Sequence, residues 1–217
     1  MKKAFTLLEL ALVIVVVGIL SVVIVPRLHD NNLRKVAEQL VFHLKYTQHL
    51  AMMDNRFDPS HDSRWYRTRW QLLFSNCGGT KDTCAYSVFS DWTGHHTGNP
   101  DAQELAVNPL NHGQLLSGGM SGNLLIKYNQ KEATKSLNIG QKYQIKKVRM
   151  HHCGSSGKRI AFDYLGRPIM GNLATMTRQY QSGRLLQQTC EMILINKDDK
   201  QITILIEPET GYIHVKE

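Results

Sequence analysis

The sequence predicts an α+β fold in which a long N-terminal helix precedes a β-rich domain. An apolar run covers residues 5–25 of the 217-residue chain, and an amphipathic pattern continues over residues 26–55. Residues 56–217 instead show short alternating segments between turn residues. A repeat of three to four residues is typical of a helix and a repeat of two is typical of a strand, so we expect the helix first and the strands after it.

The apolar run from Phe5 to Val25 is 21 residues long, and Glu9 carries its only charge. As a helix it would extend roughly 31 Å at about 1.5 Å per residue, close to the thickness of the hydrocarbon core of a bilayer. Lys2 and Lys3 precede it, and basic flanks favour the cytoplasmic side of a membrane. We therefore expect a transmembrane first half of the helix, with the C-terminal domain exported.

Glu9 and Pro26 distinguish this segment from an ordinary membrane anchor. An intramembrane carboxylate costs about 2.5 to 3.5 kcal/mol on insertion scales, so it is usually functional and paired. A free amine at Phe5, released by a cut after Ala4, is a natural partner for Glu9. Pro26 lies at the far edge of the run, where it can kink or end the helix. The alternative interpretation is a plain single-pass anchor with a buried glutamate.

Beyond Pro26 the predicted helix continues to about Asp54, before Pro59. Apolar or small residues recur there every three or four positions, and they are Leu33, Val36, Ala37, Leu40, Leu44, Thr47 and Ala51. Residues spaced in this way lie on one side of a helix. We expect this face to pack on the domain formed by residues 56–217.

Strands are expected where β-branched and aromatic residues alternate with polar ones. The predicted strands cover residues 70–74, 85–89, 124–128, 143–151, 159–164, 191–196, 201–207 and 212–216. Residues 94–122 are expected to be mainly loop with one short strand, and residues 171–183 stay open between a long loop and regular structure. Gly166 and Gly211 suit turns with positive φ, and Pro168 suits the start of an edge strand.

The chain contains four cysteines, at positions 77, 84, 153 and 190. An even number in an exported domain suggests two disulfides, although the sequence alone permits three pairings. Cys77 and Cys84 bracket a turn-rich loop, so we favour the pairs Cys77–Cys84 and Cys153–Cys190. Neither pair has the C-x-x-C spacing of a redox motif or a zinc knuckle.

No motif in the sequence predicts an enzyme, a cofactor or a metal site. Adjacent histidines such as His95–His96 and His151–His152 point to opposite faces of a strand, so they rarely bind one metal together. The chain also lacks an H-E-x-x-H motif, a nucleophile elbow and a complete phosphate loop. We therefore expect a protein that is not an enzyme and that needs no cofactor and no metal.

A basic segment covers residues 127–184, where twelve Lys and Arg residues face two acidic ones. Such a segment can bind phosphates with an affinity that falls steeply with salt. The candidate DNA contacts are Lys146, Lys147, Arg149, Lys158, Arg159 and Arg167. A solvated surface and a docking face for an acidic neighbouring subunit are the alternatives, because charge without base-stacking aromatic residues is weak support for DNA binding.

The N-terminal stretch KKAFTLLE, residues 2–9, resembles the class III signal of type IV pilins and pseudopilins. The resemblance implies that a prepilin peptidase cuts between Ala4 and Phe5 and methylates the new amine. It also implies that Glu9 pairs with the amine of a neighbouring subunit in a fibre, and that Pro26 is the helix-kinking proline of that family. Ala4 departs from the glycine that usually precedes the cut, which leaves the rate of processing open.

Two further stretches resemble the GspH/FimT group of minor pilins. They are RIAFDYLGRP at residues 159–168 and the C-terminal hairpin over residues 204–215. This resemblance implies that the β-rich domain is sandwich-like and that the protein is a minor subunit of a fibre. Some members of the group bind DNA through a Gly-Arg-x-Arg motif near the C-terminus, whereas residues 211–214 of this chain read Gly-Tyr-Ile-His.

The expected function is that of a minor pilin or pseudopilin, which initiates or caps a type II secretion pseudopilus or a type IV pilus after cleavage and methylation. The leader would be residues 1–4, the transmembrane or fibre-core segment residues 5–25, the amphipathic continuation residues 26–55 and the globular domain residues 56–217. The expected location is the inner membrane, crossed once, with a periplasmic domain and a periplasmic or surface fibre after assembly. Expected partners are other pilins, the prepilin peptidase and the inner membrane. The alternatives are a DNA-binding minor pilin of a competence pseudopilus and a solitary anchored binding module.

Overall fold

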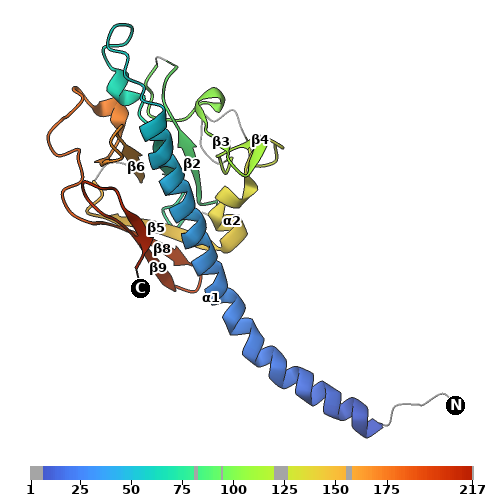
Figure 1. Cartoon of the computed structure of the whole chain (residues 1–217). Helices are drawn as coiled ribbons and strands as arrows, with labels where there is room; N and C mark the ends of the chain where they lie inside the picture. Colours follow the sequence, from blue (N-terminus) through green and yellow to red (C-terminus); the bar gives the residue numbers. More distant parts are fainter. Residues whose placement is uncertain (1–6, 81–82, 94, 120–126, 155–157, 217) are drawn as a thin grey trace.

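A helix, α1, runs over Leu7–Met53 and organises the fold. The computed structural model describes residues 7–80, 83–93, 95–119, 127–154 and 158–216, apart from the side chains of residues 22–31. The C-terminal half of α1 lies across a folded body, whereas its N-terminal half projects away from that body (Figure 1). The two halves of α1 therefore meet different surroundings.

The C-terminal half of α1 presents an apolar face to the body. Its buried apolar residues are Leu33, Val36, Ala37, Leu40, Leu44 and Ala51. They are the positions whose spacing predicted a packing face, so this prediction is confirmed. Burying one leucine side chain contributes roughly 1.5 to 3 kcal/mol, and this face therefore accounts for a substantial part of the stability of the fold.

Two antiparallel four-stranded sheets form the body. The first has the order β2-β1-β6-β7, with strands Ala85–Phe89, Gln71–Ser75, Arg159–Phe162 and Pro168–Met170. The second has the order β10-β9-β8-β5, with strands Ile213–Val215, Gln201–Ile206, Cys190–Asn196 and Ile145–His151. Strands of both sheets contact α1, so the helix closes the core over the two sheets (Figure 1).

Strand β1 shows how the first sheet is covered on both faces. Leu72 and Phe74 belong to the main core together with α1 and the second sheet. Leu73 points the other way and packs in a separate cluster with Phe89 and Leu105. Because successive side chains of a strand point to opposite faces, a strand covered on both sides has consecutive buried residues.

Between residues 94 and 143 the structure departs in detail from the prediction. The described part of the expected loop holds two short strands, β3 (Val107–Asn108) and β4 (Asn111–Leu115), which pair as a hairpin. A short helix, α2 (Ile139–Tyr143), precedes β5, so the strand expected from residue 143 begins at Ile145. Most of the strand expected over residues 124–128 lies outside the described residues.

Two turns meet on the side chain of Gln48 in α1. Gln48 Nε2 donates to the carbonyl oxygen of Gly166 over 2.8 Å and to that of Thr210 over 3.0 Å. Gly166 and Gly211 have φ values of 80° and 62°, which confirms the predicted positive φ. A Cβ at Gly211 would lie 2.4 Å from the carbonyl oxygen of Gly166, so this close approach needs glycine. Pro168 begins β7 at the edge of the first sheet, as expected.

Both predicted disulfides are present, as Cys77–Cys84 and Cys153–Cys190. The first closes the loop between β1 and β2, and the second joins the segment after β5 to the start of β8. All four cysteines belong to the main core, so each disulfide is buried beside the sheet whose segments it connects. Disulfides of this kind form in an oxidising compartment.

The predicted fold class is wrong where it places the first half of the helix across a membrane. Within the residues that the structure describes, no helix combines the length and the apolar character needed to span a bilayer. The predicted single-pass location in the inner membrane is corrected by the same finding.

Removing the Cys153–Cys190 bridge is expected to destabilise the protein more than removing Cys77–Cys84. The bridges join residues separated by 37 and by 7 positions, and the longer loop loses more entropy in the unfolded chain. The expected losses in the free energy of unfolding are about 4 and about 2.5 kcal/mol. Chemical denaturation of the two double Cys→Ala variants measures both values, and a larger loss for the short loop would contradict the entropic account.

His43 is expected to make the fold sensitive to acid. This residue lies in the buried face of α1, 2.7 Å from the Tyr86 hydroxyl through Nδ1, and burial lowers its pKa from 6.5 to about 4. The folded state therefore holds the neutral ring, whose contribution to stability is complete above pH 6.5 and is lost as the pH falls towards 4. The loss is of the order of 3 kcal/mol.

Urea denaturation of the full chain between pH 7 and pH 4 measures this dependence. His43→Gln should remove most of the loss between pH 6.5 and 4. His49→Gln, on an exposed position of the same helix, should keep the wild-type dependence. If His43→Gln has the same slope as the wild type, another group must be responsible.

Candidate functional site

The projecting half of α1 is an apolar surface that the rest of the chain leaves uncovered. Eleven large apolar side chains between Leu7 and Leu20 are exposed, from 45% at Val16 to 86% at Leu7. The five consecutive residues Val13–Val17 are all among them, and at about 3.6 residues per turn they occupy every side of the helix. Exposed apolar surface of this extent marks an interaction site.

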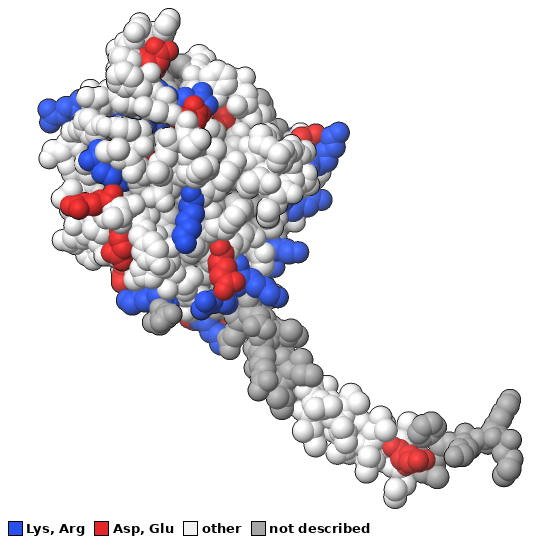
Figure 2. Space-filling model, viewed as in Figure 1, with Lys and Arg blue, Asp and Glu red and all other residues white. Residues whose placement is uncertain are grey.

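Glu9 interrupts this apolar surface close to its N-terminal end. Its side chain is exposed, and Figure 2 shows the projecting helix as white surface with an acidic side chain near the tip. Ala4 and Phe5, the predicted processing residues, lie outside the described residues. Pro26 lies within α1, so it does not end the helix, and its side chain is also outside the described part.

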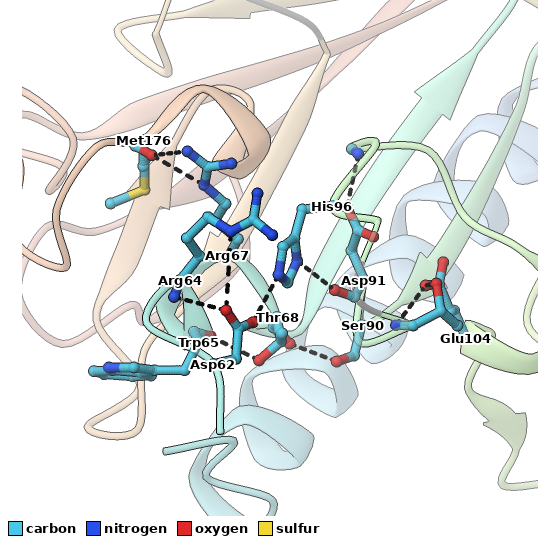
Figure 3. Close-up of polar contacts among 12 residues, drawn as sticks. Asp62, Arg64, Trp65, Arg67, Thr68, Ser90, Asp91, His96, Glu104 and Met176 are labelled. Atoms are coloured by element: carbon cyan, nitrogen blue, oxygen red, sulfur yellow. Dashed lines mark hydrogen bonds and ion pairs between the residues drawn. The ribbon is translucent and has the colours of Figure 1, made fainter. Parts of the chain in front are cut away.

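A polar cluster lies between the segment that follows α1 and the loop after β2 (Figure 3). Its centre is the buried ring of His96, whose Nε2 lies 2.7 Å from Asp62 Oδ2 and whose Nδ1 lies 3.1 Å from the carbonyl oxygen of Asp91. Both ring nitrogens thus lie within hydrogen-bond distance of an oxygen atom. His96 therefore joins the loop after β2 to the segment after α1.

The Asp62 carboxylate is held from two directions. Its Oδ1 accepts a hydrogen bond from the backbone N–H of Arg64 over 2.8 Å, while His96 approaches the other oxygen. Burial acts to raise the pKa of Asp62, but the hydrogen bonds from Arg64 and His96 outweigh it, so the pKa of this carboxyl is lowered. The ionised carboxylate is therefore part of the folded structure.

The cluster continues through Arg159, one of the predicted DNA contacts. Arg159 is buried, and its Nη1 donates to the carbonyl oxygen of Gly98 over 2.7 Å and to Asn172 Oδ1 over 3.1 Å. Burial lowers its pKa to about 10, while the same burial raises the pKa of the nearby Asp91 carboxyl. Arg159 thus holds the loop after β2 on the first sheet and is not displayed to a ligand.

Three other predicted DNA contacts are also bound within the fold. Arg167 pairs with the buried Asp163 over 2.8 Å, and Lys146 pairs with Asp199 over 2.6 Å. The Nζ of Lys158 donates to the carbonyl oxygen of Cys77. Burial and then the neighbouring Lys147 lower the pKa of Lys158.

The structure therefore brings the six basic residues together only in part. Lys146, Lys147 and Arg149 share strand β5, with Arg149 exposed and Lys147 half-buried. Arg159 and Arg167 lie in the other sheet or at its edge and are occupied there. DNA binding stays a prediction, and its strongest remaining positions are Lys147 and Arg149.

Sequence reasoning missed Asp62, His96 and Gln48. Asp62 and His96 are 34 positions apart, and Gln48 is 118 positions from Gly166, so no local pattern connects these partners. In the described part of the chain no three His, Cys, Asp or Glu side chains are placed to hold a metal ion. The candidate site is thus a surface for partners at one end and a polar cluster at the other.

Asp62→Asn is expected to lower the free energy of unfolding by about 1 to 3 kcal/mol at pH 7, because His96 would lose its charged partner in a mostly buried place. The difference from the wild type should shrink as the pH falls below the usual carboxyl range, since the wild-type Asp62 is then protonated too. Asp58→Asn is the matched control, because Asp58 pairs with His61 in an exposed position. Chemical denaturation at pH 7 and pH 3 makes the comparison, and equal effects of both substitutions would show that the His96 contact is dispensable.

Comparison with known proteins assigns no family to the chain, so its function is inferred from its own surfaces. No protein-family model, no curated protein and no solved structure matches the chain. The projecting helix, its Glu9 and the polar cluster at the opposite end are therefore interpreted from their own chemistry.

Proposed function

We propose that this protein is a pilin-like fibre subunit whose projecting helix forms the fibre core together with the helices of neighbouring subunits. The observation that carries the proposal is the exposed apolar surface around the whole circumference of α1 between Leu7 and Leu20. A helix that is apolar on all sides is stable when it is buried on all sides. The chain itself supplies no cover for this part of α1 among its described residues (Figure 1).

A bundle of helices covers such a surface better than a single partner does. Two packed helices lie about 8 to 10 Å apart, and each covers one stripe of the other. Several neighbours are needed to cover positions such as Val13–Val17, which lie all around α1. Staggered copies in a fibre provide these neighbours, and each fully buried Val, Leu or Ile side chain contributes roughly 1.5 to 3 kcal/mol.

Glu9 gives the bundle a register. A carboxylate buried in a helix core is stabilised by a cation at the same height. The resemblance of residues 2–9 to the class III signal implies that the amine of Phe5 on a neighbouring subunit, after a cut behind Ala4, is that cation. Subunits that add in another register would not bring this amine to Glu9.

The remainder of the chain forms the outer part of the fibre in this proposal. The buried face of α1 joins the core helix firmly to the two sheets, and Gln48 connects it to both turns that resemble minor pilins. A minor subunit that initiates or caps the fibre fits this resemblance best. The occupied state of Arg159 and Arg167 gives no support to DNA binding as a second function.

Glu9→Gln is expected to reduce the amount of this protein in sheared fibres at least tenfold while its total amount in the cell stays the same. Breaking a buried ion pair typically costs about 3 to 5 kcal/mol, and a tenfold change corresponds to about 1.4 kcal/mol. Glu38→Gln is the matched control, because Glu38 lies on the same helix in an exposed pair with Arg34.

Immunoblots of fibre and cell fractions measure the ratio, and mass spectrometry of the fibre fraction should find a methylated Phe5 as the first residue. Absence of the wild-type protein from every fibre fraction, together with an uncut Met1, would overturn the proposal. Equal incorporation of Glu9→Gln and wild type would remove the role of Glu9 in register.

A further inference from the structure

The C-terminal end of α1 lies at the opposite end of the molecule from the projecting helix (Figure 1). A pocket of about 340 Å³ is lined mainly by residues of the segment that follows this end. We call it the distal pocket. Its walls include the aromatic rings of Phe57, Trp65 and Trp92 and the polar side chains of Arg56, Asp58 and Asp62. Its volume lies at the lower end of the range typical of pockets for small ligands, which is roughly 300 to 1,000 Å³.

The distal pocket has one buried aromatic side chain and two that are partly exposed to solvent. Trp65 is buried, and its ring meets that of Phe57 edge to face with centroids 4.8 Å apart. Phe57 and Trp92 are nevertheless 58% and 45% exposed, although burying an aromatic side chain is favourable. Two flat apolar rings are thus held open to solvent at a pocket, where a ligand can cover them.

The charged side chains of the distal pocket already have polar partners. Arg56 pairs with Asp54 over 2.7 Å, and Asp58 lies 2.8 Å from His61. Asp62 is paired with His96, as Figure 3 shows. The carboxylates keep lone pairs that can accept further hydrogen bonds.

The position of Arg56 argues against a cationic ligand. Its guanidinium lies over the rings of Trp70 and Trp92, 5.8 Å from each centroid. A cationic ligand at Trp92 would therefore lie close to a cation of the protein itself, and the two positive charges would repel each other. An anionic ligand would meet the carboxylates of Asp58 and Asp62.

We propose that the distal pocket binds a neutral saccharide, one or two rings in size. The apolar C–H face of a sugar ring would cover the exposed rings of Trp92 and Phe57. Its hydroxyl groups would donate to the oxygens of Asp58 and Asp62 and accept from the guanidinium of Arg56. Ring faces beside a few well-placed polar groups give orientation and specificity to a neutral ligand of this kind. The inference does not depend on the fibre proposal, because the pocket is formed within a single chain.

The test is binding of soluble neutral saccharides to the full chain. The protein is kept dispersed in a polyoxyethylene detergent, because a detergent with a sugar headgroup would compete. Saturation-transfer NMR with a panel of hexoses, N-acetylhexosamines and their disaccharides identifies ligands, and calorimetric titration of the strongest one gives its Kd. Choline and a sulfated heparin disaccharide serve as the cationic and anionic probes.

We expect at least one neutral saccharide to bind, with signal transfer strongest to the protons of one ring face. Trp92→Ala should weaken this binding at least tenfold, and Asp58→Asn, at an exposed position that the fold tolerates, should weaken it by roughly tenfold through the lost charged acceptor. Tyr212→Ala is the control, because Tyr212 is 59% exposed on a different surface, and it should leave the Kd unchanged. Thermal unfolding of each variant verifies that the fold is intact.

Three results would overturn the inference. The first is the absence of binding by any neutral saccharide of the panel. The second is tighter binding of choline or of the heparin disaccharide than of every neutral sugar. The third is a Kd for a neutral sugar that neither Trp92→Ala nor Asp58→Asn changes, which would place the sugar elsewhere on the molecule.

Discussion

The packing of the second half of α1 against both sheets is the interaction on which the rest of the structure depends. Leu40 and Leu44 are fully buried in a cluster that also contains residues of β1, β8 and β9. The two sheets meet through an isolated bridge between Lys147 of β5 and Gly78 after β1, whereas α1 contacts several strands of both sheets. Changes in this face therefore affect the two sheets together, and burial of His43 there couples the whole fold to pH.

Polar contacts hold the loop after β2, which lies outside the apolar core. The loop after β2 contains few apolar residues, and it is fixed by His96, by the Gly98 carbonyl on Arg159 and by the Asp91 carboxylate, whose Oδ2 accepts the backbone N–H of Gly98 over 2.7 Å. Buried polar groups of this kind are costly unless each finds a partner, so the network determines one conformation of the loop. This conformation places Trp92 beside Arg56 and so completes the distal pocket.

The two ends of the molecule therefore offer different chemistry. The projecting helix exposes apolar side chains around its whole circumference, with the carboxylate of Glu9 among them (Figure 2). The other end offers aromatic rings beside paired polar groups, of which the Asp62–His96 pair is drawn in Figure 3. A subunit that is held in an assembly by its first end keeps the second end accessible. Fibre assembly and saccharide binding are thus separate proposals that the same architecture accommodates.

The sequence by itself indicated the order of elements, the packing face of α1, the short Cys77–Cys84 loop, the turn glycines and the edge position of Pro168, because each of these depends on local spacing or on local backbone geometry. Pairing Cys77 with Cys84 leaves Cys153 and Cys190 for each other. Residues 5–25 also had the length of a bilayer span in sequence, but the described helix does not have the character of one. Only the tertiary structure decided the use of the basic residues. Arg159 and Arg167 look like phosphate contacts in the sequence, yet their partners Gly98 and Asp163 become visible only once the chain has folded. The His96–Asp62 pair and the distal pocket are formed by segments that lie far apart in the sequence. No repeat in the sequence indicates which of these segments will contact each other.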